Sequence, residues 1–548
     1  MEVNFLNIIL CIAIGSGIFF QMYKFTSFAF PKNLVVCGLF LWALLPDDPS
    51  LKEIASIALY LGCPLILSNT VLYVFIPKKE TSKTESKYLV QFKTENGSFK
   101  INNIKRGVSI IGAAGSGKTE SIVYNLLQHF SGNSFCGLIH DYKDFEITEM
   151  AYPLFISRNL KFYILSFDKI LHRVNPIAPR YMENEEDINE VSRVLIENLL
   201  EQKESGATGV GKFFNDAAQG LISGLIWKLK VSFPEYCTLP HLIAIYQYLD
   251  TDELIDFLKS NQTSRAFADA FISGKDSERQ TAGVKSTLST ALMKISSKRI
   301  FMALAADDIP LNLNNPKNPA VISLVNNPKY DSAYSPVIAT IMHTIVKQMS
   351  VRHSLSSFLL IEEAPTIRLL NMHRIPATLR SYDIATVYVM QDKIQNDMMY
   401  GDKASKAILS NLSYQFFGKV NDPDTARFYE RFFEIIKDET KTVMRGTGLD
   451  FDTKISTGEK EIYKIRANEF FKLKQGEFIT YADGIDKKVQ FKRQKIIRRT
   501  PDEIKYFTDK EINENYIRIY KEVRNICKVF KDKKKNKKSE QITSTREN

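Results

Sequence analysis

The 548-residue sequence predicts an α/β domain that is interrupted by an all-α insertion and preceded by transmembrane helices. Three observations lead to this fold class. A glycine-rich loop lies between a short apolar run and an amphipathic run at residues 107–130, and two adjacent carboxylates follow another apolar run at residues 358–363. Long segments without charged residues precede residue 80. The stretch between the loop and the carboxylates has helical periodicity, which predicts a separate helical region.

The first 80 residues are expected to cross a membrane. Phe5–Met22 and Ile54–Ile76 are apolar, uncharged and long enough for a bilayer core of about 30 Å. Asn33–Pro46 is shorter, so both three spans and two spans with an amphipathic hairpin remain open. Lysines beside the first connection and after the last segment favour three spans and a cytoplasmic remainder. Met1 and Glu2 lack the basic start of a cleavable signal peptide.

Residues 112–119 match the P-loop pattern G-x-x-x-x-G-K-[ST]. In such a loop the backbone N–H groups wrap the phosphates of a nucleotide, the lysine reaches the β and γ phosphates, and the hydroxyl ligates Mg²⁺. The preceding run predicts a buried strand, and residues 118–130 predict a helix whose N-terminus points at the phosphates. The predicted nucleotide-binding residues are Gly112, Ala113, Ala114, Gly115, Ser116, Gly117, Lys118, Thr119 and Glu120, with Thr119 also a metal ligand.

Four apolar residues followed by Glu362 and Glu363 have the form of a Walker B strand. We expect Glu362 to hold Mg²⁺ and Glu363 to orient or deprotonate the attacking water. Lys118 and Glu362 are 244 positions apart, whereas a simple βαβ unit needs about 30. The helical stretch at residues 185–300 accounts for the excess.

Two residues after the carboxylates are further candidates for catalysis. The run Ile384–Met390 predicts a strand that ends in Gln391, where an amide can hydrogen-bond the attacking water or the γ-phosphate. An ordinary polar strand end is the alternative. Arg380 is expected on a helix just before that strand, too far from its own P-loop but suited to act in trans on a neighbour in a ring. A surface ion pair is the alternative for Arg380.

Other patterns place the remaining elements. Asn96-Gly97 predicts a hairpin between Tyr88–Lys93 and Ser98–Ile104. Buried strands are expected at Phe135–His140 and Ala320–Val325.

The sequence also predicts the environment of one lysine and the start of one helix. Lys143, after the first of those strands, is expected to face solvent, with contact to a phosphate as the alternative. Ser335 and Pro336 are good cap and first-turn residues for a helix through Met349.

The segment Glu362–Gln391, EEAPTIRLLNMHRIPATLRSYDIATVYVMQ, resembles the type IV coupling proteins of conjugative DNA transfer. That family has a carboxylate pair, a proline-containing turn, a TLRSYG-like helix and an apolar strand ending in Gln. Further stretches resemble the family in the same order: HDYK at 140–143, NPIAP at 175–179, KFFNDAAQGLISGLIWKL at 212–229 and AILSNLSYQFFGKVND at 407–422.

The resemblance implies a RecA-like motor domain with an all-α lid, anchored in the bacterial inner membrane and assembled as a homo-hexamer. It implies that ATP hydrolysis, with Mg²⁺ as cofactor, moves single-stranded DNA with its attached relaxase into a type IV secretion channel. Glu363, Arg380 and Gln391 would then be the catalytic residues. Glu362 departs from the Asp that the family usually has, and three spans would depart from the usual two.

We therefore expect five regions: transmembrane helices at 1–80, two parts of the nucleotide-binding domain at 81–184 and 303–500, an all-α domain at 185–302, and a basic tail at 501–548. Lys521–Asn548 carries ten basic and four acidic residues. This tail can dock a phosphate-bearing or acidic partner, or it can be a disordered end. The six cysteines show no C-x-x-C pairing, so neither disulfides nor a zinc site are expected.

Three functions remain open at this point: a DNA-pumping coupling ATPase, a secretion ATPase that recruits protein effectors, and a membrane scaffold that binds nucleotide without turnover. A chromosome-segregation translocase is disfavoured because of the TLRSY stretch and because no further DNA-reading domain follows the motor.

Overall fold

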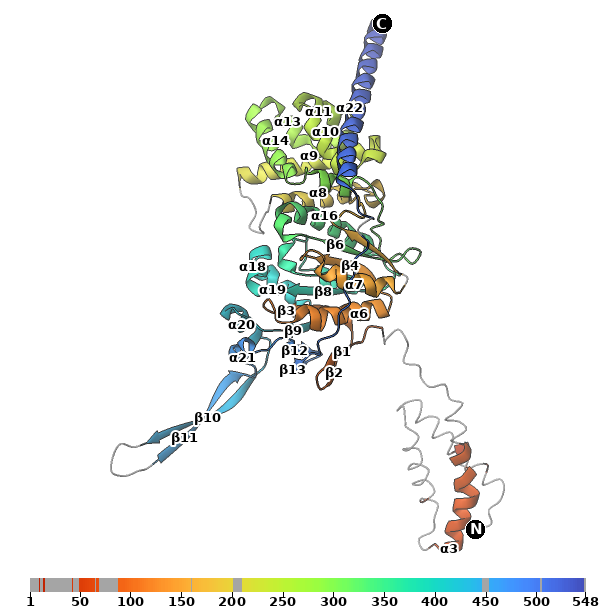
Figure 1. Cartoon of the computed structure of the whole chain (residues 1–548), viewed down its shortest axis with the longest axis vertical. Coiled ribbons are helices and arrows are strands. Elements are labelled where there is room, and N and C mark those ends of the chain that lie inside the picture. Colours follow the sequence, from red (N-terminus) through yellow and green to blue (C-terminus); the bar gives the residue numbers. More distant parts are fainter. Residues whose placement is uncertain are drawn as a thin grey trace. The chain divides into compact units, whose positions relative to one another are not determined.

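The computed structural model describes residues 49–64, 66–68, 87–158, 160–200, 209–445, 453–502 and 505–546, together with residues 9, 13, 14 and 42. The chain forms two compact units, Met1–Ser86 and Lys87–Asn548 (Figure 1).

In the first unit, helix α3 (Leu51–Ile57) continues into the π-helical turn η1 (Ala58–Gly62). Ser50 begins α3 with a capping box, in which its side chain accepts from the N–H of Glu53 and the Glu53 carboxylate accepts from the N–H of Ser50. Among the residues that the structure describes, no helix has both the length and the apolar character needed to cross a bilayer. The predicted spans fall mostly outside the described residues, so they stay a prediction.

The second unit is built on a nine-stranded sheet in the order β13-β12-β9-β3-β8-β7-β4-β6-β5. The strands from β9 to β5 are parallel, and the hairpin β12–β13 adds antiparallel to β9. The strand bounds are β3 Val108–Ile111, β4 Cys136–Asp141, β5 Lys161–Leu165, β6 Ala320–Val325, β7 Ser357–Ile361, β8 Ile384–Met390, β9 Tyr414–Phe417, β12 Glu477–Ala482 and β13 Ile485–Gln490.

The central strands β3, β4, β6, β7, β8 and β9 are buried along their whole length. This is the pattern of a parallel sheet that is covered on both faces. The predicted strands at 107–111, 135–140, 320–325, 358–361 and 384–390 are all present. The order matters for the site, because β8 lies between the P-loop strand β3 and the acid-bearing strand β7.

Two hydrophobic cores lie on the two faces of the sheet. On one face Ile122, Leu127 and Phe130 from the helices after the P-loop pack with Ile110 and Phe358. The other face is covered by α16, beyond which the helices of the insertion lie (Figure 1). The flanking helices are η3 Thr119–Val123, α6 Tyr124–Gly132, α7 Glu146–Ile156, α16 Asp331–Met349, α17 Ile375–Arg380, α18 Lys393–Tyr400, α19 Asp402–Ser410, α20 Pro423–Glu430 and α21 Ala467–Phe471.

The start predicted for α16 is wrong. The helix begins at Asp331, and Pro336 lies inside it. The Asp331 carboxylate accepts hydrogen bonds from the Ser335 hydroxyl at 2.6 Å and from the Asn326 amide at 2.8 Å. These contacts stabilise an earlier first turn, with Ser335 as a partner within the helix rather than as its cap.

The region between β5 and β6 is helical, as predicted. Its helices are α8 Glu185–Leu199, α9 Val210–Ser232, α10 Leu239–Tyr248, α11 Thr251–Lys259, α12 Gln262–Phe267, α13 Asp269–Ser273, α14 Glu278–Met293 and α15 Lys298–Leu304. Helices α14 and α15 are separate, because Ser297 caps α15 by accepting from the N–H of Ile300. The boundaries of this region as a domain stay a prediction.

Two hairpins complete the second unit. The predicted one forms from β1 (Val90–Thr94) and β2 (Gly97–Ile101), joined by Glu95 and Asn96. Sequence periodicity did not indicate the other, β10 (Ile435–Arg445) and β11 (Thr453–Tyr463). Short 3₁₀ turns are η2 Ile104–Arg106, η4 Pro179–Tyr181, η5 Pro234–Tyr236, η6 Gly274–Asp276, η7 Pro328–Tyr330 and η8 Ala364–Thr366.

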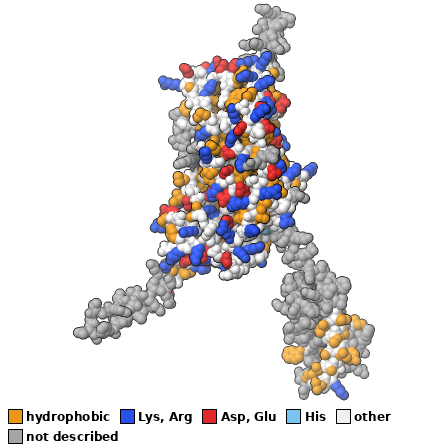
Figure 2. Space-filling model, viewed as in Figure 1, with side chains coloured by type: hydrophobic (Ala, Val, Ile, Leu, Met, Phe, Trp, Pro, Cys, Tyr) orange, Lys and Arg blue, Asp and Glu red, His pale blue; other side chains and the backbone are white. Residues whose placement is uncertain are grey.

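The C-terminal segment folds as helix α22, Asp509–Arg546. Ile519 and Val523 are fully buried where α22 packs against α10 and α15. The imidazole of His241 on α10 contacts the Glu522 carboxylate at 3.0 Å. The first half of the predicted basic tail is therefore part of the folded unit, and its docking role stays a prediction. Figure 2 shows acidic and basic side chains interspersed over the visible face of the second unit.

Candidate nucleotide-binding and hydrolysis site

The P-loop follows β3 at the carboxyl edge of the sheet and leads into η3. Gly115 and Gly117 have φ angles of +76° and +91°, which L side chains rarely adopt. A Cβ on Gly117 would lie 2.8 Å from the backbone nitrogen of Gly476. That nitrogen donates to the carbonyl of Ser116 at 2.9 Å, so the turn before β12 packs directly on the loop. The glycines of the motif are thus required by backbone conformation and by close packing.

Lys118 is buried within the loop that it ends. Its ammonium donates to the carbonyls of Gly112 and Ala113. Burial lowers the pKa of Lys118, and the charges of Glu363 and Glu362 oppose that shift. The lysine therefore lies within electrostatic reach of the predicted acids.

Glu362 follows β7 and is 2% exposed. The backbone N–H of Tyr142 donates to its carboxylate at 3.3 Å, and the His140 ring N–H donates to its carbonyl at 2.9 Å. Burial and the nearby charge of Asp141 raise the pKa of Glu362 to about 7. Glu362 thus sits among groups of β4, the strand beside β7.

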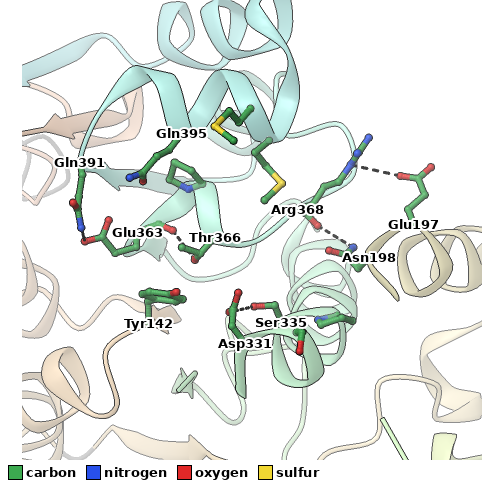
Figure 3. A pocket seen from close by; sticks show the side chains of 15 residues that line it. Tyr142, Glu197, Asn198, Asp331, Ser335, Glu363, Thr366, Arg368, Gln391 and Gln395 are labelled. Atoms are coloured by element: carbon green, nitrogen blue, oxygen red, sulfur yellow. Dashed lines mark hydrogen bonds and ion pairs between the residues drawn. The ribbon is translucent and has the colours of Figure 1, made fainter. Parts of the chain in front are cut away.

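Glu363 is held by a different set of contacts. Its backbone has a φ of +46°, a left-handed conformation that costs energy for a residue other than glycine. Its carbonyl accepts hydrogen bonds from the N–H of Thr366 at 2.8 Å and from the Thr366 hydroxyl at 2.7 Å. The Gln391 amide donates to its carboxylate at 2.9 Å (Figure 3). The strained turn points the carboxylate of Glu363 at the end of β8.

Gln391 thereby links the acid to the P-loop. The residue before it, Met390, accepts a hydrogen bond from the N–H of Gly112 at 3.2 Å. The P-loop, Gln391 and Glu363 therefore line one continuous edge, across the ends of β3, β8 and β7. The structure brings together these residues, which the sequence singled out separately.

Lys143 belongs to this edge as well. Its side chain is 38% exposed, as expected for a lysine in contact with solvent, but its ammonium pairs with the two acids, which was not expected. Its ammonium lies 3.1 Å from a carboxylate oxygen of Glu362 and 2.8 Å from one of Glu363. Burial alone would lower the pKa of Lys143, but the two carboxylates outweigh it and raise that pKa. The lysine is recruited because β4 and β7 are adjacent, which local sequence periodicity does not reveal.

The donors at this edge suit Mg²⁺. Glu362 and Glu363 supply carboxylate oxygens, and Thr119 supplies a hydroxyl at the start of the helix after the loop. Hard oxygen ligands of this kind are those that Mg²⁺ prefers. Within the described residues, the buried Ser116 hydroxyl has no hydrogen-bond partner, so the loop holds a polar atom that can meet a phosphate.

Two predicted residues lie apart from the acid cluster. The Glu120 carboxylate pairs with Arg493, with atom separations of 2.6 and 2.8 Å, so its side chain is directed at the segment after β13. Arg380 ends α17 and is exposed at the amino end of β8, whereas Gln391 lies at its carboxyl end. Arg380 therefore lies outside the site of its own chain, and its role in trans stays a prediction.

Cavities adjoin the acids and the P-loop. One of about 730 Å³ is lined by Tyr142, Asp331, Glu363, Arg368, Gln391 and Gln395 (Figure 3). Another of about 520 Å³ borders the P-loop and is lined by Ala113–Ser116, Lys419 and residues 471–475.

The helical insertion touches the segment that follows the acids. The Asn198 amide on α8 donates to the carbonyl of Arg368 at 3.1 Å (Figure 3). The Arg368 guanidinium lies 3.9 Å from the Glu197 carboxylate. This contact between α8 and the segment after Glu363 depends on residues 170 positions apart, and no local pattern indicated it.

Comparison with known proteins supports the α/β fold. A structure of the bacterial conjugative coupling protein TrwB without its first 70 residues superposes with a TM-score of 0.60 at 14% identity, over 79% of this chain and 93% of that one. TrwB in complex with ADP and Mg²⁺ gives a TM-score of 0.57 at 14% identity, over 72% and 88% of the two chains. TrwB has also been solved with the GTP analogue GDPNP, with the same score and identity over 74% and 89%. At this identity the likeness establishes a shared α/β P-loop fold.

A search of curated protein sequences found no match. The family model described as "Type IV secretory system Conjugative DNA transfer" matches residues 70–464. That range is most of the chain and contains the P-loop, the acid pair, Arg380 and Gln391. The protein therefore belongs to the type IV secretory system family of conjugative DNA transfer, the family that its sequence resembles.

Proposed function

We propose that this protein is a membrane-anchored ATPase that couples a complex of relaxase and single-stranded DNA to a type IV secretion channel and drives the DNA through it. The observation that carries the proposal is the single edge, at the ends of three neighbouring strands, that holds the P-loop, Gln391 and the two glutamates. TrwB, which shares the fold, binds ADP with Mg²⁺ and a non-hydrolysable ATP analogue. These complexes support ATP and Mg²⁺ as the cofactors of this chain.

Each residue of the edge has a distinct part in hydrolysis. The P-loop N–H groups and Lys118 bind the phosphates, and Glu363 accepts a proton from the attacking water while Gln391 orients its carboxylate. Mg²⁺, held by Thr119 and Glu362, would neutralise charge that develops on the phosphates. Glu363 suits the role of base because the Gln391 amide holds its carboxylate at the end of β8, the strand next to the P-loop strand.

Arg380 completes the proposal at the level of the assembly. It lies at the sheet edge opposite its own P-loop, so it serves a neighbouring protomer in a hexameric ring as an arginine finger. Such a ring places one site at each junction between protomers. The apolar segments before residue 80 anchor the ring as a multi-pass protein in the bacterial inner membrane.

The test is ATP hydrolysis by the full-length protein with and without single-stranded DNA. We expect DNA to stimulate hydrolysis, and Lys118→Ala to abolish both hydrolysis and DNA transfer between mating cells. Hydrolysis that responds to a secreted protein and to no DNA would instead indicate the effector-recruiting ATPase. Unimpaired transfer by Lys118→Ala would indicate a scaffold and contradict the proposal.

A further inference from the structure

Lys143 is held in place by the backbone around it. It is the second residue after β4. The next two residues, Asp144 and Phe145, have φ angles of +46° and +73°. The N–H of Asp144 donates to the carbonyl of Asn326 at 3.2 Å. Two consecutive left-handed residues other than glycine are costly, and such strain concentrates where a side chain has to be aimed. Here that side chain is Lys143, whose ammonium contacts the carboxylates of both Glu362 and Glu363.

Two ammonium groups offset the negative charge of the carboxylates at the edge. The carboxylates of Glu362 and Glu363 are almost fully buried, and the ammonium groups of Lys118 and Lys143 are the cations beside them. Glu146 adds a third carboxylate, 4.0 Å from the Lys143 ammonium. The two ammonium groups therefore offset a large part of the negative charge of the cluster. A divalent cation that arrives alone meets carboxylate oxygens of Glu362 and Glu363 that are already in contact with an ammonium, and the repulsion from that ammonium weakens its binding.

A nucleotide changes this balance. Its phosphates bring several negative charges, which Lys118 and Lys143 can pair with, and they supply further oxygen ligands for the metal. We propose that Lys143 makes Mg²⁺ binding depend on the nucleotide: its ammonium competes with free divalent cation for the carboxylates of Glu362 and Glu363 until phosphates are bound. Lys143 is then a positioning residue of the site, and this role rests on the proposed function.

The test uses Mn²⁺ as a probe that electron paramagnetic resonance detects, with the full-length protein and no nucleotide. Lys143→Met removes the charge and keeps most of the volume of the side chain. We expect the variant to bind one Mn²⁺ at least about tenfold more tightly than the wild type, because the carboxylates lose their competing cation. With ADP present, both proteins bind Mn²⁺.

Three matched variants separate charge at this position from other effects. Lys143→Arg keeps the charge and retains the weak binding of the wild type. Lys317→Met removes an exposed lysine elsewhere and changes nothing. Lys143→Gln keeps a hydrogen-bond donor for the acids, and it replaces Lys143→Met if circular dichroism shows that the latter does not fold.

Two results would overturn different claims. If Lys143→Met and Lys143→Gln bind Mn²⁺ without nucleotide no more tightly than the wild type, the role of Lys143 is wrong while the nucleotide site stands. If the wild type binds no Mn²⁺ even with ADP, both the proposed function and the role of Lys143 are wrong.

Discussion

At the scale of single residues, the site rests on two adjacent glutamates that share Lys143 as a partner and differ in their other contacts. Glu362 lies among groups of β4, whereas Glu363 takes a left-handed conformation and meets Gln391 on β8. An acid pair in an ordinary extended strand would point to opposite faces of the sheet. The turn after β7 is what brings both carboxylates to one edge.

Gln391→Ala should lower kcat about a hundredfold and leave KM nearly unchanged, because Glu363 loses the donor that orients its carboxylate. Gln395→Ala is the matched control, since Gln395 lines the same cavity but is exposed. Steady-state hydrolysis of ATP measures both constants. Equal effects of the two variants would contradict a specific role for Gln391.

The raised pKa of Glu362 makes stability depend on pH. Its pKa is about 7 in the folded protein against an ordinary value of 4.5. Between these values the folded protein binds more protons here than the unfolded chain does, so this contribution to stability is present below 4.5 and is lost as pH rises through 7. Glu362→Gln should therefore gain thermal stability relative to the wild type between pH 5 and pH 8, without nucleotide or metal. A melting-temperature difference that is the same at both pH values would refute this.

At the scale of elements, the P-loop is a packed structure, held from outside by the turn before β12. The N–H of Gly476 donates to Ser116, and Gly117 has no room for a side chain at this contact. Only the motif and its flanking strand and helix could be predicted from the sequence. The turn at Gly476 is far along the chain and carries no motif of its own.

Gly117→Ala and Gly115→Ala form a matched pair. Both residues have positive φ, but a Cβ on Gly115 meets nothing within 4 Å, whereas one on Gly117 meets the backbone of Gly476. We expect Gly115→Ala to cost about 1 kcal/mol and Gly117→Ala clearly more, since a backbone has to move. Thermal unfolding without nucleotide measures the difference, and equal losses would contradict the packing argument.

Helix α22 offers a second matched pair. Ile519 is fully buried against the helical insertion, and Ile517 is 59% exposed on the same helix. Ile519→Asp should destabilise the fold by about 3 kcal/mol or more, and Ile517→Asp by less than about 0.5 kcal/mol. Unfolding followed by circular dichroism compares them. Similar effects would show that α22 does not dock as described.

At the scale of the whole molecule, local patterns predicted the elements better than the contacts between them. The strand at 384–390, the hairpin at residues 90–101 and the helical insertion follow from periodicity and turn residues within short windows. The contacts of Lys143 with the acids, of Arg493 with Glu120 and of Asn198 with Arg368 were missed. Each joins residues that are distant in sequence and that only the packing of the whole fold brings together.

Contacts between distant parts of the chain connect the nucleotide site with the helical insertion. The segment after Glu363 contacts α8, the strand β13 is followed by Arg493 beside the P-loop, and α22 then packs on the insertion. The site is therefore connected to the helical region in two places, through the segment after Glu363 and through the chain that follows β13. Arg380 lies at the opposite sheet edge. In a ring of protomers it would connect this chain with the site of a neighbouring protomer.

The central claim is that Lys118 and Glu363 serve one nucleotide in one site. The most direct measurement is a single-turnover assay with radiolabelled ATP on the wild type, Lys118→Ala and Glu363→Gln. The account predicts that Glu363→Gln retains bound, uncleaved ATP and that Lys118→Ala retains none, while the wild type releases phosphate. Cleavage of ATP by Glu363→Gln at the rate of the wild type would contradict it.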